Sequence, residues 1–67
     1  MRKLVRTNVD GYLTEMDSWR GTPSKQDIID CLMDYHLLDE SEEAADDLLD
    51  NGEAYMNDSS CTVYTLI

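Results

Sequence analysis

The chain has 67 residues, enough for one domain with a thin hydrophobic core, so we expect residues 1 to 67 to form a single domain. Its apolar fraction of 42 % predicts a folded protein rather than a disordered one, although the formal net charge is −10. All five Lys and Arg residues lie within the first 25 positions, whereas residues 26 to 67 carry 12 acidic residues, and this half argues against direct binding of nucleic acids or anionic membranes.

Residues 3 to 18 predict a β-hairpin. Polar and apolar side chains alternate on both sides of the pair Asp10-Gly11. An Asp-Gly pair suits the positive φ angles of a tight hairpin turn, so we place the turn there. Gly21 and Pro23 then predict an irregular connection.

A first helix is expected over residues 24 to 37. Thr22 or Ser24 can cap its start, and Asp27 stands three residues after Ser24, which is the spacing of a capping box. One face of this helix carries Ile28, Ile29, Leu32, Met33 and His36. The acidic residues Asp27, Asp30 and Asp34 fall on another face.

A second helix is expected over residues 40 to 50. Asp39 or Ser41 can cap it, and Asn51-Gly52 predicts a left-handed end. Its narrow apolar stripe consists of Ala44, Ala45, Leu48 and Leu49.

Residues 53 to 67 predict a second hairpin with its turn at residues 57 to 60. The expected order is two strands, two helices and two strands. We therefore predict an α+β fold, in which the two hairpins form an antiparallel sheet and the helix pair packs on one face of it.

The stretch DESEEAADDLLDNGE, residues 39 to 53, holds eight acidic residues and no basic one. One interpretation is a calcium loop of the EF-hand type, with Gly52 at its sixth position. That alignment puts Leu49 where an oxygen ligand is needed, and the helical stripe runs through the same residues. We therefore expect a helix here, and no metal or cofactor.

Carboxylates on these helices have a spacing suited to a basic partner. Side chains three or four residues apart on a helix have Cβ atoms ~5–6 Å apart. This roughly resembles the phosphate spacing along a nucleic-acid strand, so the carboxylates can pair with the Lys and Arg side chains that bind phosphates. Like charges at this spacing destabilise a helix by ~0.2–0.5 kcal/mol per pair, and a basic partner would relieve that repulsion. The residues expected to contact such a partner are Asp27, Asp30, Asp34, Asp39, Glu40, Glu42, Glu43, Asp46, Asp47 and Asp50.

The acidic stretch also fits two simpler interpretations. It can be a solvated helix face with no partner. It can also reflect adaptation to high salt, which screens self-repulsion. Adaptation to high salt should reduce Lys and Arg throughout the chain, whereas here all five lie at one end, which argues against that interpretation.

The segment DYHLLDESEEAADDLLDNGE, on an expected helix pair between hairpins, resembles the small acidic inhibitors encoded by bacteriophages and mobile elements. The resemblance is one of size and composition over roughly residues 27 to 58. It implies an imitation of DNA that occupies the nucleic-acid groove of a host protein. Restriction systems, CRISPR effectors, repair enzymes such as glycosylases, nucleoid proteins and RNA polymerase are the targets that this class implies.

Residues that could suggest an enzyme are isolated. His36 is the only histidine, and we expect it to end the first helix, where its charge suits the helix dipole. Ser59 and Ser60 fall in a turn signal and lack a nucleophile motif. The acidic surroundings of Cys31 should raise its pKa, and Cys31 and Cys61 are expected to be reduced and mostly buried, with a single disulfide as the alternative. We expect no catalytic activity.

Trp19 and Tyr35 are further candidates for partner contact. Trp is over-represented among binding hot spots, although Trp19 more simply covers a core that has no Phe. Tyr35 and Tyr55 are the tyrosines expected to be exposed. There is no signal peptide and no apolar segment near the ~20 residues of a membrane span, so we expect a cytoplasmic protein.

Three functional hypotheses follow. The first is an inhibitor whose acidic face blocks the basic DNA- or RNA-binding groove of a host protein. The second is an acidic adaptor or antitoxin-like protein, which would bind through a mixed surface including Trp19, Tyr35 and Tyr55 without competing with nucleic acid. The third is a subunit that forms a homodimer through an exposed strand edge at residues 62 to 67.

Overall fold

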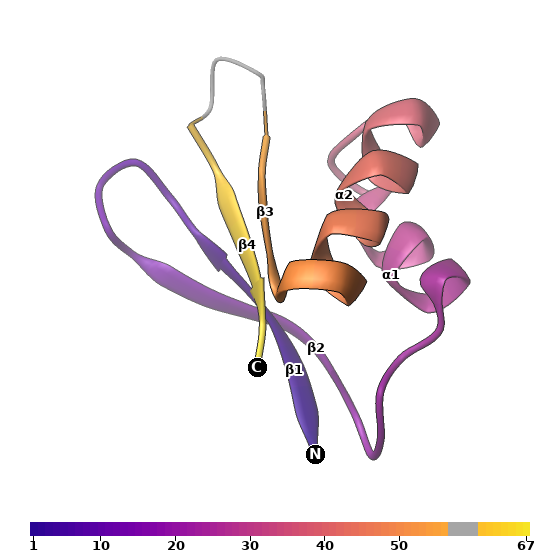
Figure 1. Cartoon of the computed structure of the whole chain (residues 1–67). Coiled ribbons are helices and arrows are strands. Elements are labelled where there is room, and N and C mark those ends of the chain that lie inside the picture. The colour runs from indigo at the N-terminus through magenta and orange to yellow at the C-terminus, as the bar shows by residue number, and fades with distance from the viewer. Residues whose placement is uncertain (57–60) are drawn as a thin grey trace.

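The computed structural model describes residues 1–56 and 61–67, which contain six elements in the order ββααββ (Figure 1). They are β1 (Arg2–Thr7), β2 (Leu13–Trp19), α1 (Lys25–Leu32), α2 (Leu38–Asn51), β3 (Glu53–Tyr55) and β4 (Val63–Leu66). The strands form one antiparallel sheet in the order β2-β1-β4-β3, and both helices lie on the same side of it. The predicted α+β fold is confirmed.

The first hairpin has a three-residue loop. The Asn8 N–H donates to the Tyr12 carbonyl at 3.0 Å, and the Gly11 N–H donates to the Asn8 carbonyl at 2.9 Å. Gly11 has φ of 88°, whereas Asp10 has no positive φ. The hairpin is confirmed, but its turn includes Val9 and only its glycine adopts the left-handed region.

Helix α1 begins as predicted and ends earlier. Ser24 accepts from the Asp27 N–H, and the Asp27 carboxylate accepts from the Ser24 N–H, each at 3.1 Å. The helix ends at Leu32 rather than at residue 37, because the N–H groups of both Tyr35 and His36 donate to the Leu32 carbonyl and close a turn. Leu37 is then extended, so residues 33 to 37 connect the helices.

Helix α2 begins two residues earlier than predicted. Leu37 is its N-cap residue, and the Leu37 N–H donates to the Glu40 carboxylate at 3.1 Å. Asp39 and Ser41 are therefore inside the helix, and the prediction that either caps it is wrong. Ser41 instead faces the core. The predicted left-handed end is confirmed at Gly52, where φ is 82°.

The second hairpin is joined to the first through the centre of the sheet. β3 pairs with β4, and β4 pairs with β1 so that Leu66 lies opposite Leu4. The predicted turn at residues 57 to 60 lies outside the described residues. Since β4 has a neighbour on each side, the expectation of a free edge at residues 62 to 67 is wrong.

The core lies between the helices and one face of the sheet. Its buried apolar residues are Leu4, Ile28, Ile29, Leu32, Ala44, Ala45, Leu48, Ala54, Met56, Tyr64 and Leu66. Strand alternation sends Tyr64 and Leu66 of β4 toward the helices, while Val63 and Thr65 face the other side. No helix covers that second side within the described chain (Figure 1).

Candidate functional site

Core packing forces the acidic side chains of α2 outward. Ser41, Ala44, Ala45 and Leu48 are its buried residues, and the remaining positions of the helix are exposed or half-buried. Of the ten predicted contact residues, eight are exposed: Asp27, Asp30, Asp34, Asp39, Glu42, Glu43, Asp46 and Asp50. Glu40 and Asp47 are half-buried on one flank of α2. Asp34 lies in the connection between the helices and not on the first helix as predicted. We call these ten residues, from both helices and that connection, the acidic helix surface.

Four of these carboxylates have partners within the chain. Asp46 forms an ion pair with Lys25 of α1 at 3.0 Å, so one base from the first 25 residues lies against the acidic helix surface. Asp27 and Glu40 accept backbone N–H groups at the helix starts. Asp30 accepts from the Gln26 amide nitrogen at 2.8 Å.

The other six carboxylates make no hydrogen bond or ion pair within residues 1–56 and 61–67. They are Asp34, Asp39, Glu42, Glu43, Asp47 and Asp50. Five of them belong to α2. This helix therefore presents a row of accessible negative charge that the described chain leaves uncompensated.

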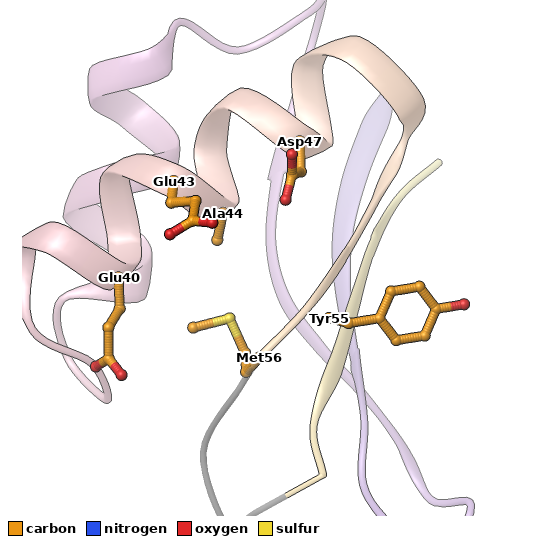
Figure 2. A pocket seen from close by; sticks show the side chains of 6 residues that line it. All are labelled: Glu40, Glu43, Ala44, Asp47, Tyr55 and Met56. Carbon is orange, nitrogen blue, oxygen red and sulfur yellow. The ribbon is translucent and has the colours of Figure 1, made fainter.

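A groove lies between α2 and β3 (Figure 2). Glu40, Glu43 and Asp47 border it from the helix. The Met56 side chain extends from the end of β3 toward α2, and Ala44 completes an apolar floor. Its volume is about 100 Å³, so it suits one side chain rather than a small-molecule substrate.

Tyr55 also borders this groove, but its ring points away from α2 (Figure 2). The prediction that Tyr55 is exposed is confirmed, at 65 %. Sequence reasoning did not find Met56 or Ala44 as parts of a groove. The alternation of the pattern Glu53-Ala54-Tyr55-Met56 was the available signal, since it predicts that Ala54 and Met56 face the helices.

Trp19 and Tyr35 lie apart from the groove. Trp19 is half-buried against the core on β2, at the sheet edge opposite to β3. Tyr35 is exposed in the connection between the helices, and the Arg6 guanidinium carbon lies 5.0 Å from its ring centroid. The structure therefore does not unite Trp19 with the acidic groove in one surface.

His36 does not end a helix, which corrects the prediction. Its Nε2 lies 2.7 Å from the Tyr64 hydroxyl oxygen, and the two rings meet edge to face with centroids 5.6 Å apart. Tyr64 is fully buried, so this contact ties the connection between the helices to the core. His36 thus packs against the core as a structural residue. Ser59 and Ser60 lie outside the described residues.

Both cysteines are free thiols. Partial burial raises the pKa of Cys31, and the carboxylates of Asp17 and Asp34 raise it further, as the sequence predicted. Cys61 is exposed rather than buried, and it adopts a positive φ of 52°. A raised pKa reduces the thiolate fraction of Cys31 and makes it a poorer nucleophile at neutral pH.

In residues 1–56 and 61–67, no group of three or more His, Cys, Asp or Glu side chains is arranged to hold a metal ion. Over the same residues, neither helix has the length and apolarity needed to cross a bilayer.

Comparison with protein-family models, with curated proteins and with solved structures finds no match to this chain.

Proposed function

We propose that the protein is a stoichiometric inhibitor that places its acidic helix surface in the basic DNA- or RNA-binding groove of a host protein. The observation that carries this proposal is the row of five α2 carboxylates that have no partner in the described chain. Such a row offers Lys and Arg side chains the charge that they meet on a phosphate backbone. The inhibitor acts by excluding nucleic acid from the groove.

The charge distribution also favours fast capture of such a partner. The formal net charge is −10, and 12 of the 15 acidic residues lie in residues 26 to 67. A concentrated field of one sign steers a basic surface toward α2 and raises the association rate, an effect that falls with ionic strength. The host protein belongs, on this proposal, to restriction, CRISPR, repair or transcription machinery.

Competition with nucleic acid tests the proposal. The tagged protein is incubated with bacterial lysate, and bound proteins are eluted first with duplex DNA or RNA and afterwards with a salt gradient. We expect a nucleic-acid-binding protein in the first elution, and we expect the purified pair to be dissociated by its cognate nucleic acid. A partner that stays bound at saturating nucleic acid would contradict the inhibitor proposal and favour the adaptor.

A charge-matched pair of variants shows whether the acidic helix surface makes the contact. The first variant carries Asp39→Asn, Glu43→Gln and Asp50→Asn, and the control carries Asp10→Asn, Glu15→Gln and Asp17→Asn on the first hairpin. Both remove three negative charges. We expect the first to lose at least about tenfold in affinity, since each contact between charged groups contributes about 1 kcal/mol or more, and the control to lose much less. Equal losses would mean that only net charge matters.

A further inference from the structure

The strand β3 has a free edge that borders the acidic groove. In the pairing with β4, the Leu66 N–H donates to the Gly52 carbonyl at 2.8 Å, and the Met56 N–H donates to the Thr62 carbonyl at 3.0 Å. Residues of an antiparallel strand direct their N–H and C=O groups alternately to the two sides. The backbone groups of Glu53 and Tyr55 therefore point away from β4, toward the edge where the described sheet has no further strand.

Helix α2 supplies charge and an apolar contact beside that edge. Glu40, Glu43 and Asp47 form the flank of α2 that borders the groove, and the Met56 side chain lies at its floor (Figure 2). Neither Glu43 nor Asp47 has a partner within the described chain. Free backbone groups and free carboxylates thus lie on the same groove.

An extended segment suits these two features together. A strand added beside β3 would receive hydrogen bonds from Glu53 and Tyr55, and every second side chain would then face the α2 side of the sheet. A Lys or Arg at that position would lay its aliphatic stem on Met56 and bring its charged head to Glu43 and Asp47.

We propose that the free edge of β3 binds an extended, basic segment of the partner protein, with one Lys or Arg side chain in the groove beneath α2. This inference rests on the proposed function only in taking the partner to be a basic protein. Self-pairing is a poorer occupant, because a second copy of β3 would bring its own Glu53, Glu43 and Asp47 to the same edge.

A short peptide tests the inference without the host protein. The probe is a blocked hexapeptide of alternating Thr and Arg, and its control is a hexapeptide of alternating Pro and Arg, which has the same charge but cannot donate its alternate backbone hydrogen bonds. Binding is followed by two-dimensional NMR of the ¹⁵N-labelled full chain at 150 mM salt. We expect saturable shifts at Glu53 and Tyr55, with slower amide exchange at both, for the Thr peptide only. Equal shifts with the Pro peptide would overturn strand addition.

Two variants with the same net charge test whether an Arg side chain of the peptide lies in the groove. Glu43→Gln with Asp47→Asn removes charge at the groove, and Glu42→Gln with Asp50→Asn removes it elsewhere on α2. The groove variant should weaken the Thr peptide by about tenfold, and the other by less than about threefold. Equal losses would overturn the groove assignment. If the Glu53 and Tyr55 amide signals shifted with increasing protein concentration in the absence of peptide, the occupant of the edge would be a second copy of this chain.

The two proposals fail separately. Peptide binding at β3 combined with a host partner that nucleic acid cannot displace would overturn only the inhibitor mechanism. Displacement of the host partner by nucleic acid, with no saturable peptide binding at β3, would overturn only strand addition.

Discussion

The Lys25 ammonium nitrogen lies 3.0 Å from a carboxylate oxygen of Asp46 and so joins the first turn of α1 to the middle of α2. Both side chains remain largely accessible to water. This pair leaves Asp46 less available to a partner than its neighbours on the acidic helix surface, although all of them looked equivalent in the sequence.

The Lys25–Asp46 pair should contribute little to stability at physiological salt. Exposed ion pairs typically contribute about 0.2–1 kcal/mol, because water and ions screen them. A double-mutant cycle with Lys25→Gln and Asp46→Asn, measured by urea denaturation, should give a coupling energy in that range at low salt. The coupling should shrink in 0.5 M NaCl. A coupling that stays constant with salt would contradict this assignment.

Salt should stabilise the protein as a whole. Repulsion among the α2 carboxylates acts in the folded state, and added ions screen it. We expect the midpoint of thermal unfolding to rise between 10 mM and 0.5 M NaCl, and to rise less in the Glu43→Gln, Asp47→Asn variant. Relief of each like-charge pair should make that variant more stable at low salt by about 0.2–0.5 kcal/mol. A midpoint that falls with salt would show that attractive pairs outweigh the repulsion.

Gly52 should be far less tolerant of substitution than Gly21. Gly52 has φ of 82°, and a Cβ there would meet the Leu66 carbonyl oxygen at an ordinary 3.7 Å, so the penalty comes from the backbone angle. Gly52→Ala should lower the free energy of unfolding by about 1–2 kcal/mol. Gly21 has no positive φ and open space around it, so Gly21→Ala is the control and should be near neutral. Equal effects of the two changes in chemical denaturation would contradict this account.

Cys31 should react slowly with iodoacetamide. Partial burial and the charges of Asp17 and Asp34 raise its pKa, so less thiolate is present at pH 8 than in an unfolded chain. In a Cys61→Ser variant, we expect urea to accelerate the alkylation of Cys31 by a larger factor than it accelerates the alkylation of a small free thiol. The raised pKa also means that the folded state favours the neutral thiol. The free energy of unfolding should therefore begin to fall as pH rises past the ordinary thiol pKa, and it should stop falling above the raised pKa of the folded state.

Local patterns were sufficient to predict most of the elements. The Ser24–Asp27 capping box and the left-handed Gly52 are where the sequence places them, because each depends on residues within one turn. The Asp10-Gly11 pair correctly predicted the hairpin, but it did not determine the length of the hairpin loop. The same two residues fit a two-residue turn and the end of a three-residue loop, and only the pairing of Asn8 with Tyr12 separates these.

The end of α1 and the groove beside β3 depend on contacts between residues distant in sequence, and these could not be predicted from local patterns. No glycine or proline separates the two helices, so the end of α1 at Leu32 was not visible, and the contact of His36 with Tyr64 joins residues 28 positions apart. The groove requires β3 to be an edge strand. That position follows from the pairing of β1 with β4, which alternation within each strand cannot reveal.

The central pairing of β1 with β4 has a consequence during synthesis. Leu4 can be buried against Leu66 and Tyr64 only after the last described strand has left the ribosome. When the first hairpin is synthesised, the edge of β1 that pairs with β4 is therefore unpaired. It stays unpaired until both helices and β4 have been synthesised. The sheet is therefore complete only when β4 has paired with β1, the strand of the chain that is made first among the four.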